Sequence, residues 1–254
     1  MHSSSLCALL HFYNVTEKNP LALTIKGREI KFNDAVFEYK SPVIGNPSNM
    51  DVVLIGDNDK VVLFLECKFA EYYLSTEKTY KCSEEYRDFF RDYLRMEPKG
   101  DKEHPWYSSD LKIYMGNAIR TRNGKKEDCI ELKIKNDPSV YLTGIKQMVA
   151  HHIGICNVIN GNMIDGSEKQ ERINKCLEKG YKLFLGEILF DFGKVTEVVK
   201  KRYEEKYEAL ATMLNKRCER IHVLDKVLTY NEIFNNEEKP YNFASRIKAF
   251  YYGK

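Results

Sequence analysis

The chain has 254 residues, of which 43% are hydrophobic, so it is long enough for one large domain or two small ones with a sizeable core. Its 40 basic and 37 acidic residues give a net charge of +3. This balance argues against wholesale disorder and permits local basic patches without itself indicating a nucleic-acid partner. No apolar run approaches the roughly 18 residues that cross a bilayer, so we expect no membrane partner.

Seven cysteines are scattered along the chain, and no C-x-x-C pair occurs. An odd number of cysteines without paired spacing predicts neither a disulfide framework nor a cysteine-based zinc or iron–sulfur site. Free thiols suit a reducing compartment, and we therefore expect a cytoplasmic protein.

The N-terminal part of the chain predicts an amphipathic helix followed by three strands. The helix is expected in the opening stretch MHSSSLCALLHFYNV, where the serines can act as caps. Segments rich in Val, Ile and Phe, bounded by Asp, Asn and Gly, predict strands at 34–45, 50–56 and 60–69. Because the connections are short, the strands should form an antiparallel meander.

The rest of the chain predicts further helices and strands. They are a helix over 75–97 that Pro98 ends, a basic hairpin tip over 119–128 with an Asn-Gly turn, a helix that Thr143 caps and that runs to about Cys156, a strand over 181–192, a charged helix around 195–220, and a last strand within 221–234.

Three charged residues, Asp51, Glu66 and Lys68, interrupt the two most apolar strands. Charges inside strands are usually paired or bind metal, because burial without a partner is costly. A two-residue turn centred on Asn58 and Asp59 places Asp51 opposite Glu66, and side-chain alternation places Lys68 on the same face. Two acids that close repel each other, and Mg²⁺ between them would remove the repulsion, because it prefers carboxylate oxygens. Lys68 could then orient or deprotonate a metal-bound water.

The Glu-x-Lys triplet alone carries little information, because it recurs elsewhere in the chain, as Glu29–Lys31, Glu38–Lys40, Glu131–Lys133, Glu204–Lys206 and Glu237–Lys239. Glu66–Lys68 differs from these by its apolar strand and by the acid across the hairpin. Spacing favours equally an ordinary ion pair between Asp51 and Lys68 at a sheet edge.

This pattern resembles the PD-(D/E)xK nuclease superfamily, which includes many restriction endonucleases, RecB-type nucleases and archaeal junction resolvases. Asp51 matches the acid of the first hairpin strand, Glu66-Cys67-Lys68 matches (D/E)-x-K, and Met50 replaces the usual proline. The resemblance implies an α/β fold with a restriction endonuclease-like mixed β-sheet core of helix, three-stranded antiparallel meander, helix and strand, flanked by helices. It also implies a metal site formed by Asp51, Glu66 and the main-chain carbonyl of Cys67.

Many RecB-like members carry Q-x-x-x-Y on the helix after the hairpin. Here QMVAH places Gln147 and His151 four residues apart on one helical face. The resemblance therefore assigns Gln147 to the catalytic group, while His replaces Tyr at position 151. From the sequence alone, His151 and His152 are equally typical of helix-surface residues, with His152 partly in the core.

The resemblance implies a single domain over residues 1–254, with an insert at about 74–140 and a C-terminal extension from about 194. It implies a Mg²⁺-dependent DNA endonuclease in which Mn²⁺ can substitute, with a role in restriction or defence, and analogy with restriction enzymes suggests a homodimer. The alternatives are an inactive nuclease-fold module that binds nucleic acid or a protein, and an RNA-directed nuclease.

The segment RTRNGKK brings four basic residues together at the predicted hairpin tip: Arg120, Arg122, Lys125 and Lys126. Such a tip could clamp the phosphate backbone of DNA. A solvated loop explains the same residues equally well.

Overall fold

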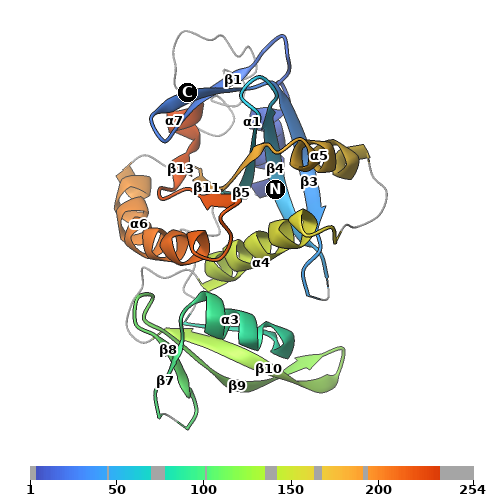
Figure 1. Cartoon of the computed structure of the whole chain (residues 1–254). Coiled ribbons are helices and arrows are strands. Elements are labelled where there is room, and N and C mark those ends of the chain that lie inside the picture. The colour runs from blue at the N-terminus through green and yellow to red at the C-terminus, as the bar shows by residue number, and fades with distance from the viewer. Residues whose placement is uncertain are drawn as a thin grey trace.

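The computed structural model describes residues 4–44, 46–69, 78–100, 102–134, 142–162, 168–190 and 194–234. It has helices and several sheets in a mixed α/β arrangement, which confirms the predicted class. Figure 1 shows a central sheet with helices around it and a second, smaller sheet below.

The central sheet has six strands and is mixed. Its order is β12-β11-β5-β4-β3, and β13 also pairs with β11. The strands are β3 (Asp34–Ser41), β4 (Ser48–Gly56), β5 (Val61–Lys68), β11 (Lys182–Leu189), β12 (Ile221–Val223) and β13 (Leu228–Thr229). The pairs β3–β4 and β4–β5 are antiparallel and form a meander, whereas β11 runs parallel to β5.

The hairpin of β4 and β5 has the register that the turn at Asn58 and Asp59 predicts. Val52 lies opposite Leu65, and Gly56 lies opposite Val61. Every residue of β5 is buried, because layers cover both faces of the sheet, and this accounts for the continuous apolar run in the sequence.

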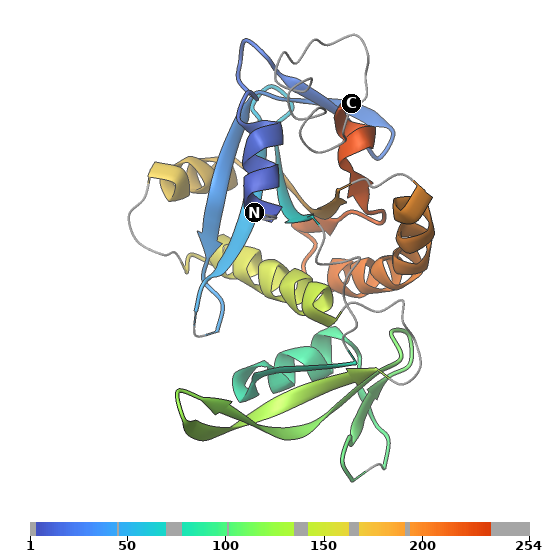
Figure 2. The ribbon, with the colours of Figure 1, turned by 180° about the vertical axis from the view of Figure 1, so that it is seen from behind.

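Different elements cover the two faces of the central sheet. One face packs on α1 (Ser4–Phe12), on the hairpin of β1 (Leu21–Ile25) and β2 (Arg28–Phe32), and on α7 (Tyr230–Phe234). The other packs on α4 (Leu142–Ile159), α5 (Glu168–Glu178) and α6 (Lys194–Asn215). Figure 2 shows α1 on the near side of the meander, with α4 running below it.

Residues of the predicted insert form a second sheet, in the order β6-β10-β9-β8-β7. Its elements are β6 (Thr79–Ser83), a 3₁₀ turn (Glu84–Tyr86), α3 (Arg87–Tyr93), β7 (Glu97–Pro98), β8 (Trp106–Ser108), β9 (Ile113–Arg122) and β10 (Lys125–Ile134). In Figures 1 and 2, α3 lies between this sheet and α4. Buried residues of the insert and of the central sheet belong to one continuous apolar cluster.

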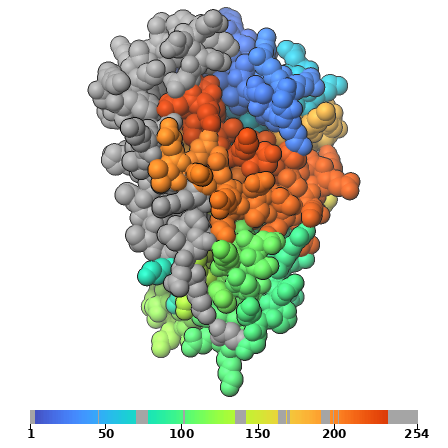
Figure 3. Space-filling view, turned by 90° about the vertical axis from the view of Figure 1, so that its left-hand side faces the viewer, coloured from blue at the N-terminus to red at the C-terminus, as the bar shows by residue number. Residues whose placement is uncertain are grey.

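The insert also meets the C-terminal end of α6. Arg217, just beyond that helix, forms an ion pair of 2.8 Å with Asp92 on α3. Figure 3 shows this face of the molecule, where α6 (orange) lies against the insert (green).

The helix predicted over 75–97 is largely wrong. Residues 75–77 lie outside the described part of the chain, Thr79–Ser83 is strand β6, and only Arg87–Tyr93 is α-helical. The helical spacing of Tyr86, Phe90 and Leu94 is real, and all three side chains are buried. The preceding residues instead pair with β10, because strand pairing across the insert overrides local helical spacing.

Three other parts of the chain differ from the prediction. Helix α4 begins at Leu142, so Thr143 lies inside it rather than capping it, and the helix continues to Ile159. The last predicted strand divides into β12, β13 and α7. The hairpin of β1 and β2 was not predicted, although its turn at Lys26 and Gly27 has the positive φ values, 50° and 73°, that Gly favours.

The close approach of α4 to β3 requires a glycine at position 154. A Cβ there would lie 2.1 Å from Ser41 Oγ and 2.8 Å from Ser41 Cβ. We expect Gly154→Ala to lower the free energy of unfolding by roughly 1–3 kcal/mol in denaturant titrations, since overpacking outweighs the gain in helix propensity. In a Ser41→Gly background the same substitution should cost clearly less. An equal cost in both backgrounds would contradict this explanation.

Candidate active site

The candidate site lies where β4 begins and β5 ends. The last paired residues of this ladder are Val52 and Leu65, so Asp51 and Glu66 follow directly beyond it. The Cys67 N–H donates to Asp51 Oδ2 at 2.8 Å instead of to a main-chain carbonyl. The Asp51 carboxylate therefore lies at the point where the two strands stop pairing.

Asp51 is held from the side of α1. The Ser5 hydroxyl donates to Asp51 Oδ1 at 2.7 Å, so the helix that covers one face of the sheet reaches the acid between the strands. The Cys67 side chain packs in the apolar cluster on this same face. Cys67 thus meets Asp51 through its main chain, and the metal-binding role of its carbonyl stays a prediction.

Glu66, Lys68 and Gln147 meet on the other face of the sheet. The Lys68 ammonium donates to Glu66 Oε1 and to Gln147 Oε1, both at 2.6 Å. The Gln147 amide in turn donates to Glu66 Oε1 at 2.7 Å. The structure therefore brings these three predicted residues into one closed network, in which the Lys68 side chain is only 3% exposed.

His151 belongs to this network, and its interpretation as a helix-surface residue is wrong. Its side chain is buried, and Nε2 lies 2.8 Å from Glu66 Oε2. Because a carboxylate only accepts hydrogen bonds, Nε2 donates to Glu66, and Nδ1 lies 2.7 Å from the Ser48 hydroxyl. The spacing of four from Gln147 was the signal that could have found it. His152 is also buried, in the apolar core beside Tyr93.

A further acid, Glu187 on β11, was not predicted. It lies beside Glu66 in the parallel pairing of β11 with β5, and it is fully buried. The Tyr203 hydroxyl donates to Glu187 Oε2 at 2.6 Å, whereas Oε1 has no hydrogen-bond partner within the described part of the chain. No sequence pattern joins Glu187 to Glu66, because the two strands are far apart in the chain and only their pairing brings them together.

The buried acids differ in their electrostatics. Burial alone would raise the pKa of Glu66, but Lys68 and His151 outweigh it and lower that pKa to about 2. Burial and repulsion from Glu66 raise the pKa of Asp51 to about 6 despite the hydrogen bonds from Ser5 and Cys67. Burial also raises the pKa of Glu187. The site therefore holds more buried carboxylate than Lys68 alone can balance.

The donor set fits a hard divalent cation in its chemistry. Asp51 and Glu66 provide carboxylate oxygens, which Mg²⁺ prefers. Burial and the repulsion from Glu66 raise the pKa of Asp51, and a cation would offset that repulsion. In this structure, both Glu66 oxygens accept hydrogen bonds, from Lys68, Gln147 and His151. Across the residues that the structure describes, no three His, Cys, Asp or Glu side chains are grouped closely enough to hold a metal ion.

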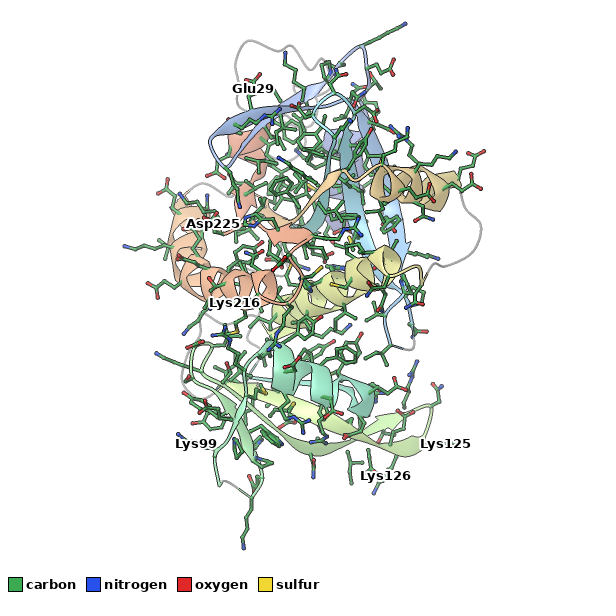
Figure 4. The ribbon with its side chains drawn as sticks, viewed as in Figure 1. Glu29, Lys99, Lys125, Lys126, Lys216 and Asp225 are labelled. Carbon is green, nitrogen blue, oxygen red and sulfur yellow. The ribbon has the colours of Figure 1, made fainter. Side chains whose placement is uncertain are left out.

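The basic hairpin forms as predicted, with its Asn-Gly turn between β9 and β10. Arg122 lies opposite Lys125, and Arg120 lies opposite Glu127, so these four side chains share one face while Lys126 lies on the other. The Arg120 guanidinium is paired with Glu127 at 3.0 Å. Figure 4 shows Lys125 and Lys126 at the free end of the hairpin. The structure therefore does not bring this tip into the Glu66 network.

Comparisons with known proteins give no family: no protein-family model matches the chain, and neither the curated proteins nor the solved structures contain a match. Among the described residues, no helix is long and apolar enough to cross a membrane.

The raised pKa of Asp51 predicts a specific pH dependence of stability without divalent cations. The folded chain releases this proton near pH 6, whereas the ordinary value is 3.8, so the folded state binds more protons between these values. Stability that depends on this proton is present below about pH 4 and is lost as the pH rises through about 6. Relative to the native chain, Asp51→Asn should therefore gain roughly 3 kcal/mol between pH 4 and pH 7.

Urea titrations in EDTA at several pH values measure this difference. The same substitution at the exposed Asp110 controls for the loss of an aspartate. A constant difference between Asp51→Asn and the native chain across this pH range would refute the assignment.

Proposed function

We propose that this chain is a metal-dependent nuclease of the PD-(D/E)xK type that hydrolyses phosphodiester bonds in DNA. The observation that carries the proposal is the network of Glu66, Lys68 and Gln147, which come from a strand and from a helix 79 or more residues further along the chain. A Glu-x-Lys triplet that formed only a surface ion pair would not require a hydrogen bond from a half-buried glutamine on another element.

The surrounding fold adds support to the proposal. In chain order, α1 precedes the meander of β3, β4 and β5, and α4 precedes β11, which is compatible with the helix, meander, helix and strand of the expected core. The hairpin of β1 and β2 and helix α5 are additional elements in this order. In this interpretation, residues 79–134 belong to an insert and α6 begins the C-terminal extension.

Each residue has a role in the proposed reaction. Asp51, Glu66 and the carbonyl of Cys67 would hold Mg²⁺ or Mn²⁺, which supplies a polarised phosphate oxygen and a more acidic water. Lys68 would orient the attacking water and offset charge on the phosphate. Gln147 holds the Lys68 ammonium through its Oε1, and His151 fixes the Glu66 carboxylate through Oε2.

The burial of Lys68 favours a second candidate function. Its ammonium is closed in an ion pair of 2.6 Å with Glu66, and neither side chain is more than 5% exposed. A closed pair is also what a nuclease fold would retain after losing its metal, as a module that binds nucleic acid or a protein. Calorimetric titration with Mn²⁺ separates the two functions: an active site binds the ion and loses it in Glu66→Gln, whereas an inactive module shows no such binding.

Cleavage assays test the nuclease directly. Purified protein with Mg²⁺ or Mn²⁺ should cut DNA, and EDTA should stop it, with duplex DNA, single-stranded DNA and RNA offered in parallel to establish the substrate. Asp51→Ala and Lys68→Ala should each lower the rate at least about 100-fold, because they remove groups that act on the reacting phosphate.

Lys133→Ala is the matched control, because Glu131 and Lys133 form the same triplet on β10, away from the Glu66 network. It should cut at the native rate. Circular dichroism and thermal unfolding must show that each variant folds. Native cutting by Lys68→Ala would refute the role of that lysine, and a native protein that cuts none of these substrates would refute the nuclease.

A further inference from the structure

Lys146 is a cation held at the boundary between α4 and the insert. It directly precedes Gln147, and its ammonium lies 5.2 Å from the centroid of the Tyr86 ring. Tyr86 is buried and stacks on Phe90 with ring centroids 5.6 Å apart. The ring is thus fixed by the core of the insert, and the ammonium of the half-buried Lys146 lies against it.

Within the described residues, the Lys146 ammonium forms no ion pair. Burial lowers its pKa, although the charges of Cys82 and Glu66 act in the opposite direction. Partly buried ammonium groups usually have a partner, because desolvation of an unpaired charge is unfavourable. Lys146 directly precedes Gln147 on α4, so its side chain begins beside the Glu66 network.

The negative charges of the site make the approach of a phosphodiester unfavourable without a further cation. Asp51 and Glu66 are two carboxylates, and the Lys68 ammonium is already paired with Glu66. A phosphodiester that approaches these acids is repelled unless other positive charges compensate. The long, flexible stem of Lys146 can bring a point charge to a phosphate oxygen on the side of the site that faces the insert.

We propose that Lys146 is a phosphate-binding residue of this site, which contacts a backbone phosphate of the nucleic acid where α4 meets the insert. The inference rests on the proposed function and extends it, because it makes the boundary between α4 and the insert part of the substrate-binding surface. The contact is to the backbone, so it contributes affinity and position but no sequence preference.

A structural role predicts different behaviour. If the Lys146–Tyr86 contact only attaches the insert to α4, removal of the charge changes stability and leaves DNA binding unchanged. Lys99 is a matched control, because its ammonium lies 4.9 Å from the centroid of the Tyr107 ring. Figure 4 places Lys99 on the far side of the insert from α4.

The experiment measures binding of a fluorescently labelled 20-base-pair DNA duplex by anisotropy, in EDTA and at several NaCl concentrations. EDTA prevents cleavage and makes the result independent of the metal. The variants are Lys146→Gln, Lys146→Met, Lys146→Arg and Lys99→Gln, each checked by thermal unfolding. Lys146→Met keeps the apolar stem on Tyr86, so it replaces Lys146→Gln if that variant does not fold.

We expect Lys146→Gln and Lys146→Met to weaken binding roughly tenfold at low salt and to reduce the slope of log K against log salt by about 0.9, the value for one phosphate contact. Lys146→Arg should bind nearly as the native chain does, because it keeps the charge, and Lys99→Gln should be unchanged. Native affinity and slope in Lys146→Met, or an equal loss in Lys146→Arg, would overturn the inference alone. A native protein that binds no DNA would overturn both this inference and the proposed function.

Discussion

The buried ion pair between Glu66 and Lys68 is the interaction on which the rest of the site depends. Two charges inside an apolar strand are tolerated only when every lone pair and proton finds a partner, and here the partners come from α4. Gln147 joins both members of the pair, and His151 takes the remaining oxygen of Glu66. The position of α4 on the sheet is therefore an electrostatic requirement as well as a packing one, and the close contact at Gly154 allows it.

At the end of the β4–β5 ladder, the two predicted acids form hydrogen bonds with different elements of the fold. Asp51 takes the main-chain N–H that would otherwise continue the ladder, and Ser5 holds it from the side of α1. Glu66 is held from the side of α4. The two carboxylates are therefore neighbours whose hydrogen bonds lead to opposite faces of the sheet. A cation that bound both would tie these two layers together at the point where the strands stop pairing.

The sequence predicts those parts of the structure that depend on local pattern. The apolar strands and the turn centred on Asn58 and Asp59 determine the register of the β4–β5 hairpin, and the helical spacing of Gln147 and His151 indicates a shared face. The predicted common face of Asp51, Glu66 and Lys68 is wrong, because Asp51 is held from the side of α1 whereas Glu66 and Lys68 are held from the side of α4. What it cannot predict is long-range pairing. Glu187 reaches Glu66 only through the parallel contact of β11 with β5, and β6 is a strand only because β10 lies beside it. The spacing of His151 from Gln147 indicates that the two share a helical face, but the contact of His151 with Glu66 depends on how α4 packs on β5.

The central claim is that Asp51 and Glu66 are ligands of one divalent cation and that Lys68 acts beside it. A crystal structure of the protein soaked in Mn²⁺, with anomalous diffraction measured at the manganese edge, tests this claim most directly. The account predicts an anomalous peak in contact with carboxylate oxygens of both acids, with the Lys68 ammonium next to it. A map without a peak there, in which Lys68 still closes its ion pair with Glu66, would contradict it.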